Sequence, residues 1–362
     1  MNVVTRRAIS ATAALSLALL ALTACGSDAG SSSDSIANTT VGLLLPEKSS
    51  STRYEAFDKP LIEKSVASLC TRCTIDYANA DGSEETQKQQ FDALLAKGIK
   101  VILLDPVNAK NTAPWVEEAK AKGAKVVAYD RLASGNVAAY VSFDNIRTGE
   151  LQGTALLDAL GGKAAEANIV MINGAETDPN AASFKSGAHT TLDGKVKAIA
   201  YEQSGEWKPD VAAQKMNDAI HQLGKNGIQA VYVANDGMAA SVIETLKAAG
   251  IKNVPVGGQD ASIEAVQRVL SGEQTYTIYK PYQPETDAAG TIAVLLLKGL
   301  DVSSVASSIT ESNGSHIPSM LLTPIVVTKA KVGVTVIDGG LYTKEEVCTA
   351  PFVDACAAAG IQ

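Results

Sequence analysis

The chain has 362 residues, and 46% of them are hydrophobic, which is enough apolar material for at least one large core and excludes a disordered protein. Its length alone favours two domains. The formal net charge is −8, and loss of residues 1–24, which hold Arg6 and Arg7 and no acid, moves it to −10. This acidic balance argues against nucleic acid as a partner.

The first segment predicts export and a lipid anchor. Arg6 and Arg7 precede an apolar run at 8–22, which has the length of a signal-peptide core and is short for a membrane span. The letters LTAC, ending at Cys25, are typical of a bacterial lipoprotein cleavage site; the alternative is a signal peptide with a chance cysteine. We expect 1–24 to be a lipoprotein signal peptide, Cys25 to carry lipid and the Ser- and Gly-rich stretch 25–40 to be a flexible tether. The protein would then lie outside the cytoplasm, on the outer face of the membrane.

After residue 40, short β-branched runs alternate with helical patterns. In the first half we predict a helix at 83–98, capped by Ser83, and strands at 40–46, 74–80, 100–106, 125–131 and 138–144. In the second half we predict helices at 210–224, 238–250 and 286–300, and strands at 168–175, 196–203, 230–236, 254–260 and 275–281. This number of strand–helix units is more than one open sheet comfortably holds. We therefore predict an α/β fold class with two doubly wound lobes. A late strand at 321–329 has no neighbouring helix and is expected to return to the other lobe.

Polar residues follow the predicted strands where they end. They are Asp130 with Arg131, Asp144 with Asn145, Asn235 with Asp236, Gln259 with Asp260, and Lys280. Each one alone is explained equally well by a helix N-cap or a loop ion pair, but in a parallel α/β sheet such positions meet at the ligand crevice. Carboxylate, amide and cationic groups together can pair the hydroxyls of a neutral polyol, and Tyr54 and Trp207 can cover its apolar faces.

Nothing in the sequence resembles a catalytic or cofactor-binding motif. There is no G-x-S-x-G, Walker or H-E-x-x-H pattern, and His189 and His221 are isolated from each other. We therefore expect no enzyme activity, no cofactor and no metal. The four cysteines after Cys25 allow three disulfide pairings, of which proximity favours Cys70 with Cys73 and Cys348 with Cys356; a zinc site is the alternative.

The strand ends form an ordered set that resembles a known family. The letters TRY, AYDR, SFDN followed by GELQ, DPNA, AND, GQDA, YKP and LLTPIVV occur in this order. The chain is similar to the periplasmic sugar-binding proteins of ABC importers, most closely the xylose-binding and multiple-sugar-binding proteins, from Val41 to about Val347. The resemblance implies two Rossmann-like lobes joined by three crossover segments, with a sugar in the cleft and a hinge that closes over it.

The resemblance also implies the ligand-binding residues. From the first lobe it brings Lys48, Arg53, Tyr54, Asp130 and Arg131; from the second it brings Asn180, Trp207, Asn235, Asp260 and Lys280. The sequence departs from the xylose binders at Tyr54, where they have Trp, and at Pro179, where a second Asn is common. Both positions bear on which sugar fits.

The implied lobes are discontinuous in the sequence. The first would hold 41–146 and 283–315, the second 147–282 and 316–347, and residues 348–362 would form a disulfide-stapled tail. The crossovers would fall near 144–149, near 282–284 and before the late strand. The implied partners are a monosaccharide, an ABC permease and its ATPase, with the membrane reached through the lipid anchor only and the protein acting as a monomer.

Competing functions make different demands on the sequence. A sugar-responsive repressor needs a helix-turn-helix and a basic surface, which this sequence does not offer. A glycosidase needs a general acid, and Arg131 beside Asp130 lowers a carboxyl pKa, which is wrong for that role. A sensory receptor for another aldose or a furanosyl signalling molecule would differ only on a lobe surface and stays open. The leading hypothesis is a transport receptor that captures a monosaccharide, xylose before others.

Overall fold

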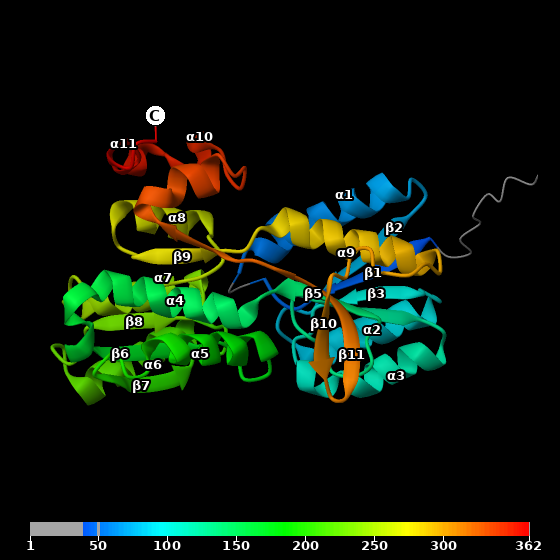
Figure 1. Ribbon diagram of the computed structural model, residues 1–362, viewed down its shortest axis with the longest axis horizontal. Helices are drawn as coiled ribbons and strands as arrows, with labels where there is room; N and C mark the ends of the chain where they lie inside the picture. The colour runs from blue at the N-terminus through cyan, green and yellow to red at the C-terminus, as the bar shows by residue number, and fades with distance from the viewer. Residues whose placement is uncertain (1–38, 49–50, 362) are drawn as a thin grey trace, which may run out of the picture. The chain divides into compact units, whose positions relative to one another are not determined.

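The computed structural model describes residues 39–48 and 51–361, which belong to one compact unit (Figure 1). The predicted signal peptide, the predicted lipid attachment at Cys25 and the tether up to residue 38 lie outside the described residues. The described chain forms two lobes, each built of β-strands covered by helices, as the fold class predicted.

The first lobe is built on a seven-stranded sheet in the order β10-β11-β5-β4-β3-β1-β2. Its parallel strands are β1 (Thr40–Leu45), β2 (Thr74–Asn79), β3 (Val101–Leu104), β4 (Lys125–Tyr129), β5 (Ala139–Phe143) and β11 (Ser315–Leu322); β10 (Ser308–Ser312) is antiparallel to β11. The helical segments are η1 (Tyr54–Asp58), α1 (Lys59–Leu69), α2 (Glu84–Ala96), η2 (Ala109–Asn111), α3 (Ala113–Ala121) and α9 (Tyr282–Leu297). Ser83 caps α2 by accepting from the Thr86 amide, as predicted.

The second lobe contains a three-stranded sheet in the order β7-β6-β8 and a two-stranded sheet, β12-β9. The strands are β6 (Asn168–Asn173), β7 (Ala198–Ser204), β8 (Ala230–Val233), β9 (Tyr276–Tyr279) and β12 (Ile325–Thr328). The helical segments are α4 (Asn145–Leu160), η3 (Gly161–Glu166), α5 (Pro179–Leu192), α6 (Pro209–Leu223), α7 (Asp236–Ala248) and α8 (Ile263–Ser271). The buried runs of β6 and β8 lie in one core with α4, α5, α6 and α7.

The strand predicted at 254–260 is wrong. Only two isolated bridges form there, Val231 with Val256 and Gly257 with Tyr276. Backbone hydrogen bonds still join this stretch to Val231 of β8, through Pro255 and Gly257, and to β9, from Gly258 and Asp260, before the backbone turns into positive φ at Asp260 (99°) and Ala261 (51°). This short buried connection still fills the gap between β8 and β9 and delivers Asp260 to the end of the sheet.

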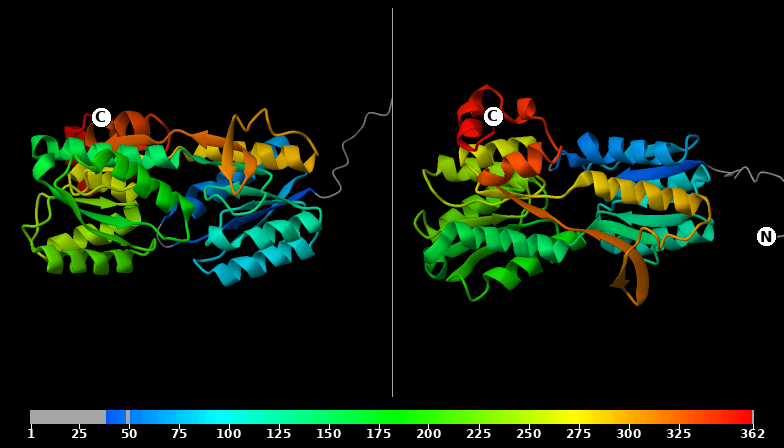
Figure 2. Two further views of the ribbon diagram at one scale, coloured as in Figure 1. Left: turned by 60° about the horizontal axis from the view of Figure 1, so that its bottom comes forward. Right: turned by 45° about the horizontal axis from the view of Figure 1, so that its top comes forward.

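The chain passes between the lobes at three places, two of which differ from the expected ranges. Residues 145–149 already form the first turns of α4, so the first crossing lies at Asp144. The second crossing lies at Lys280 and Pro281, between β9 and α9. The late strand is divided at Thr323 and Pro324: β11 pairs with β5 of the first lobe, and β12 pairs with β9 of the second (Figure 2). The lobe boundary expected at 315 is therefore displaced to Leu322.

The C-terminal segment, residues 329–361, packs on the second lobe and reaches the first. It contains η4 (Lys329–Lys331), η5 (Val332–Ile337), α10 (Lys344–Val347), η6 (Ala350–Phe352) and α11 (Val353–Ala358). Its buried side chains, among them Val336 and Val347, share a core with α8. Tyr342 then contacts Phe57 of the first lobe, with ring centroids 5.8 Å apart. The structure joins Cys348 to Cys356 in this segment and Cys70 to Cys73 at the end of α1.

Candidate functional site

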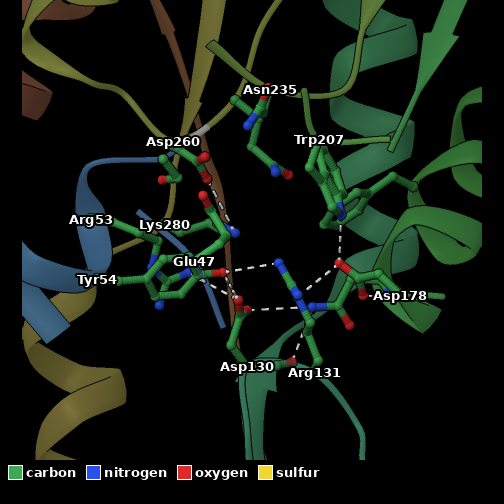
Figure 3. Close-up of a pocket in the computed structure, with 14 residues that line it drawn as sticks. Glu47, Arg53, Tyr54, Asp130, Arg131, Asp178, Trp207, Asn235, Asp260 and Lys280 are labelled. Carbon is green, nitrogen blue, oxygen red and sulfur yellow. Dashed lines mark hydrogen bonds and ion pairs between the residues drawn. The ribbon is translucent and has the colours of Figure 1, made fainter. Parts of the chain in front are cut away.

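Side chains from both lobes surround one cavity with an empty volume of about 330 Å³ (Figure 3). The lining residues are Glu47, Ser51, Arg53, Tyr54, Asp130, Arg131, Asp178, Asn180, Phe184, Trp207, Asn235, Gln259, Asp260 and Lys280. Nine of the ten ligand-binding residues expected from the sequence are in this set. The tenth, Lys48, is exposed and is not among the lining residues.

Asp130 and Arg131 face different partners although they are adjacent in the sequence. Asp130 has a positive φ of 53°, and its carbonyl oxygen accepts hydrogen bonds from Tyr140, Ser142 and Asn180. This anchors the turn and separates the two charges. The Arg131 Nε lies 3.0 Å from an Asp178 carboxylate oxygen, and its Nη1 donates to the Pro106 carbonyl at 3.1 Å. The dipeptide therefore serves two sides of the cavity.

Arg53 is held mainly by carboxylates behind the cavity. Its Nε and Nη2 donate to both oxygens of Asp58 at 2.8 and 2.7 Å, and Nη2 also donates to Glu285 at 2.6 Å. Its Nη1 lies 3.5 Å from Asp130 Oδ2 and has no hydrogen-bond partner among the described residues. Arg53 is therefore a lining residue with one guanidinium nitrogen that donates no hydrogen bond to the described residues.

The two predicted aromatic walls differ in their contacts. Tyr54 is buried, and its hydroxyl donates to Asp130 Oδ2 at 3.3 Å and accepts from Arg131 Nη2 at 3.4 Å. Trp207 is partly buried against the second-lobe core and donates from Nε1 to Asp178 at 3.1 Å. Its ring lies on Gly174, where an added Cβ would be 2.0 Å from Cζ2. Glycine at 174 is thus required for the position of this wall.

The far side of the cavity is formed by the second-lobe strand ends. Asn235 caps α7 by accepting from the Met238 amide at 3.0 Å, so the helix-cap role and the pocket position coexist. Lys280 Nζ lies 3.3 Å from Asp260 Oδ1, an oxygen that accepts no hydrogen bond from the described residues. Both residues are at most 6% exposed.

Burial and charge act in opposite directions on the pKa values of this site. Burial alone would raise the pKa of Asp130, but Arg53, Lys280 and Arg131 outweigh it and hold this pKa below the usual value. Burial would lower the pKa of Lys280, and Asp130 and Asp260 raise it instead. These groups are therefore charged at neutral pH. A low-pKa carboxylate is a hydrogen-bond acceptor and is unsuited to act as a general acid.

Sequence reasoning missed Glu47, Ser51, Asp178 and Phe184 as lining residues, and Gln259 was noticed as a strand end without being assigned to the site. Asp178 is the most important of these missed residues. Its Oδ1 caps α5 by accepting from the Asn180 amide, and its Oδ2 contacts Arg131 and Trp207. Its signal in the sequence was Asp followed by Pro at a strand end, which reads as a simple N-cap. Within the described residues, no group of three or more His, Cys, Asp or Glu side chains is placed to hold a metal ion.

Two lobes joined by three crossings, with charged and amide side chains from both around one cavity, define a solute-binding protein. A family model for the periplasmic binding protein domain matches residues 41–301. The D-xylose-binding periplasmic protein of Escherichia coli is 34% identical over 297 residues, which are 80% of this chain and 87% of that protein. The chain belongs to the family of periplasmic sugar-binding proteins that serve ABC transporters, whose members bind solutes for transport and are not enzymes.

Two further comparisons extend this similarity, one over more of the sequence and one to a solved structure. The multiple sugar-binding periplasmic receptor of Rhizobium radiobacter is 28% identical over 360 residues, which are 93% of this chain and 98% of that protein. The crystal structure of a carbohydrate transporter solute binding protein from Chloroflexus aurantiacus in complex with D-glucose matches with a TM-score of 0.76 and 25% identity. That match covers 84% of this chain and 97% of the other.

Proposed function

We propose that this protein is the receptor of an ABC importer that captures a monosaccharide, xylose before other aldoses, between its lobes. The observation that supports this most is a pair of buried polar atoms on the cavity, Arg53 Nη1 and Asp260 Oδ1, that lack hydrogen-bond partners among the described residues. Buried polar groups are normally paired, so an unpaired donor and acceptor on one cavity favour a ligand with both capacities. A sugar hydroxyl has both.

The two-lobed placement of the contacts supports a hinge that closes on the sugar. Arg53, Asp130 and Arg131 come from the first lobe, and Asp260 and Asn180 come from the second. A ligand that touches both sets binds the closed form better than the open form, and only such a difference can shift the population. The closed receptor would then deliver the sugar to the permease and its ATPase as a monomer.

A lipid anchor at Cys25 is proposed from the sequence alone. No helix within 39–48 and 51–361 has the length and apolarity needed to cross a bilayer. We expect the Cys25→Ser variant to leave the membrane fraction and to bind sugar with unchanged affinity, measured by fractionation and calorimetry. Retention of that variant on membranes would contradict the anchor.

The test of the function is a thermal-shift screen of residues 35–362 against xylose, glucose, arabinose, galactose and ribose, followed by calorimetry. A sugar that binds only the folded state raises the melting temperature by mass action. Asp260→Asn should reduce or abolish the shift, whereas the exposed Asp218→Asn on α6 should keep it. Absence of a shift with every aldose would overturn the proposal and favour a furanosyl or non-sugar ligand.

A further inference from the structure

Acidic side chains outnumber basic side chains around the cavity. Three buried cations, Arg53, Arg131 and Lys280, are the only basic groups in the described lining. Their ion-pair partners are six buried carboxyl groups: Asp58, Asp105, Asp130, Asp178, Asp260 and Glu285. Glu47, 9% exposed, adds a seventh carboxyl group at the cavity wall. Each cation therefore already faces at least one carboxylate before any ligand arrives.

The unpaired atoms show the same excess of acceptors. On the lining residues, the acceptors Asp260 Oδ1 and Gln259 Oε1 and the donors Arg53 Nη1 and Arg131 Nε have no hydrogen-bond partner among the described residues. Behind the lining, three more acceptors, both carboxyl oxygens of Asp105 and Oε1 of Glu285, have no hydrogen-bond donor among the described residues. Burial raises the pKa of Asp105, Asp178 and Glu285, and the charge of Asp130 raises all three further, against the nearby cations that lower them. Such a cavity is completed by a ligand that donates hydrogen bonds, and an anion would add to the excess.

A groove that adjoins the cavity is also lined by more acidic than basic side chains. The groove has an empty volume of about 1530 Å³ and shares Glu47, Arg131 and Trp207 with the cavity. Its other charged lining residues are four acids and two bases: Asp81, Glu84, Glu176, Glu206, Lys208 and Lys215. An anionic solute would therefore meet an acidic groove on a protein whose net charge is also negative.

We propose that this pocket selects its sugar by charge: it accepts neutral aldoses, tolerates a protonated amino sugar and rejects uronic acids and sugar phosphates of the same ring configuration. This inference rests on the proposed function, because it concerns which sugars enter the same cavity. It concerns the charge of the ligand, whereas the ring configuration is set by the individual hydroxyl contacts.

The test compares matched sugars at pH 7 by calorimetry: D-glucose with D-glucuronate and D-glucosamine, and D-galactose with D-galacturonate and D-galactosamine. In the series whose neutral member binds, we expect the uronate to bind at least ~100-fold more weakly and the amino sugar to bind within ~10-fold. Because buried charges are screened little by salt, the uronate should remain excluded at 0.5 M NaCl, where the acidic groove is screened.

The Glu47→Gln variant separates the effect of charge from the effect of shape. It removes one lining carboxylate at nearly constant size, and we expect the ratio of uronate to neutral-sugar affinity to rise ~10-fold, with Glu206→Gln at the outer groove as the matched control. Equal binding of a uronate and its neutral partner by the unaltered protein would overturn the charge inference and leave the function standing. Binding of uronates alone would overturn the inference and change the cargo. If no sugar of these series binds and no aldose of the thermal-shift screen, xylose included, binds either, the proposed function itself is wrong.

Discussion

At the scale of single residues, the site is formed by side chains that each have two structural roles. Tyr54 contributes a ring to the cavity, and its hydroxyl joins Asp130 to Arg131. Asp178 caps a helix and also orients Arg131 and Trp207. Such double roles fix the rotamers of charged side chains before a ligand is bound, which lowers the entropy lost on binding.

The hydroxyl of Tyr54 can be tested separately from its ring. Tyr54→Phe keeps the ring and removes the two contacts at 3.3 and 3.4 Å, so we expect sugar affinity to fall about 10-fold, equivalent to ~1.4 kcal/mol for the lost hydrogen bonds. Calorimetry with the sugar identified in the screen measures this change. Tyr201→Phe on β7, outside the lining, is the control, and equal affinities of the two variants would contradict the role of the hydroxyl.

Asp236, next to the lining residue Asn235, gives the folded protein a pH-dependent term. Burial and Asp260 raise its pKa from 3.8 to about 7, against Arg268, Gln274 and Thr277, which lower it. Between these two pH values the folded state holds a proton that the unfolded state has lost. The stability from this group is therefore complete below about pH 4 and is lost as the pH rises through about 7, by roughly 2 to 4 kcal/mol.

Asp236→Asn mimics the protonated form at every pH. We expect the free energy of unfolding of the variant, relative to the unaltered protein, to increase from pH 5 to pH 8.5 in urea titrations. Two curves that run parallel over this range would show that Asp236 does not titrate there.

At the scale of elements, α4 and α5 bring two polar N-termini together because their backbones meet at glycines. A Cβ on Gly149 would lie 2.0 Å from the Phe184 carbonyl oxygen, and one on Gly187 would lie 2.0 Å from that of Ile146. This close crossing lets Asn145, at the start of α4, donate to Asn180, at the start of α5, at 2.9 Å. Asn180 in turn donates to the Asp130 carbonyl, so helix spacing fixes a contact across the cavity.

Gly149→Ala should force these two helices apart. Overpacking between backbones costs about 1 to 3 kcal/mol, so the melting temperature should fall and sugar affinity should weaken as Asn180 moves. Gly162→Ala in η3 is the matched control, since nothing lies within 4 Å of its added Cβ and its φ is not positive. Equal melting temperatures for the two variants would contradict the close crossing.

Much of this element structure was predictable, and the exceptions have physical reasons. The centres of three predicted strands, at 41–45, 101–104 and 230–233, hold no charged or amide side chain because these strands are buried on both faces, a pattern typical of parallel sheets. The glycines at 149 and 187 carry no sign of their partner helix in the sequence. The division of 321–329 depends on Pro324, which lacks the amide that a strand interior needs, yet only the pairing partners show which part joins which sheet.

At the scale of the whole molecule, the described lobes contact each other on two sides of the cavity. On the cavity side, Arg131 lies 3.0 Å from Asp178, and Thr177 accepts from the Ala109 amide at 3.1 Å. On the hinge side, Phe57 of the first lobe contacts Tyr342 of the C-terminal segment with ring centroids 5.8 Å apart, and within its own lobe it stacks on Tyr282 at 5.0 Å. Phe57 belongs to η1, which also carries Tyr54, so this contact connects the hinge to the site.

Removal of the Tyr342 ring should loosen the hinge-side contact. For Tyr342→Ala we expect a larger radius of gyration of the unliganded protein in X-ray scattering and a sugar affinity reduced about 3- to 10-fold, because less of the protein is in the closed form. Val334→Ala is the control, since Val334 is 65% exposed on the same segment. Unchanged scattering and affinity in Tyr342→Ala would show that the ring does not restrain the lobes.

A hydrogen bond from Asn180 to the Asp130 carbonyl and an ion pair between Arg131 and Asp178 join the two lobes across the cavity. A sugar hydroxyl that displaces either contact exchanges one polar interaction for another, so we expect calorimetry to record a smaller net enthalpy than the number of contacts in the complex would suggest. The same exchange makes binding selective, because a solute that cannot replace every contact it displaces leaves a buried charge without compensation and therefore binds weakly.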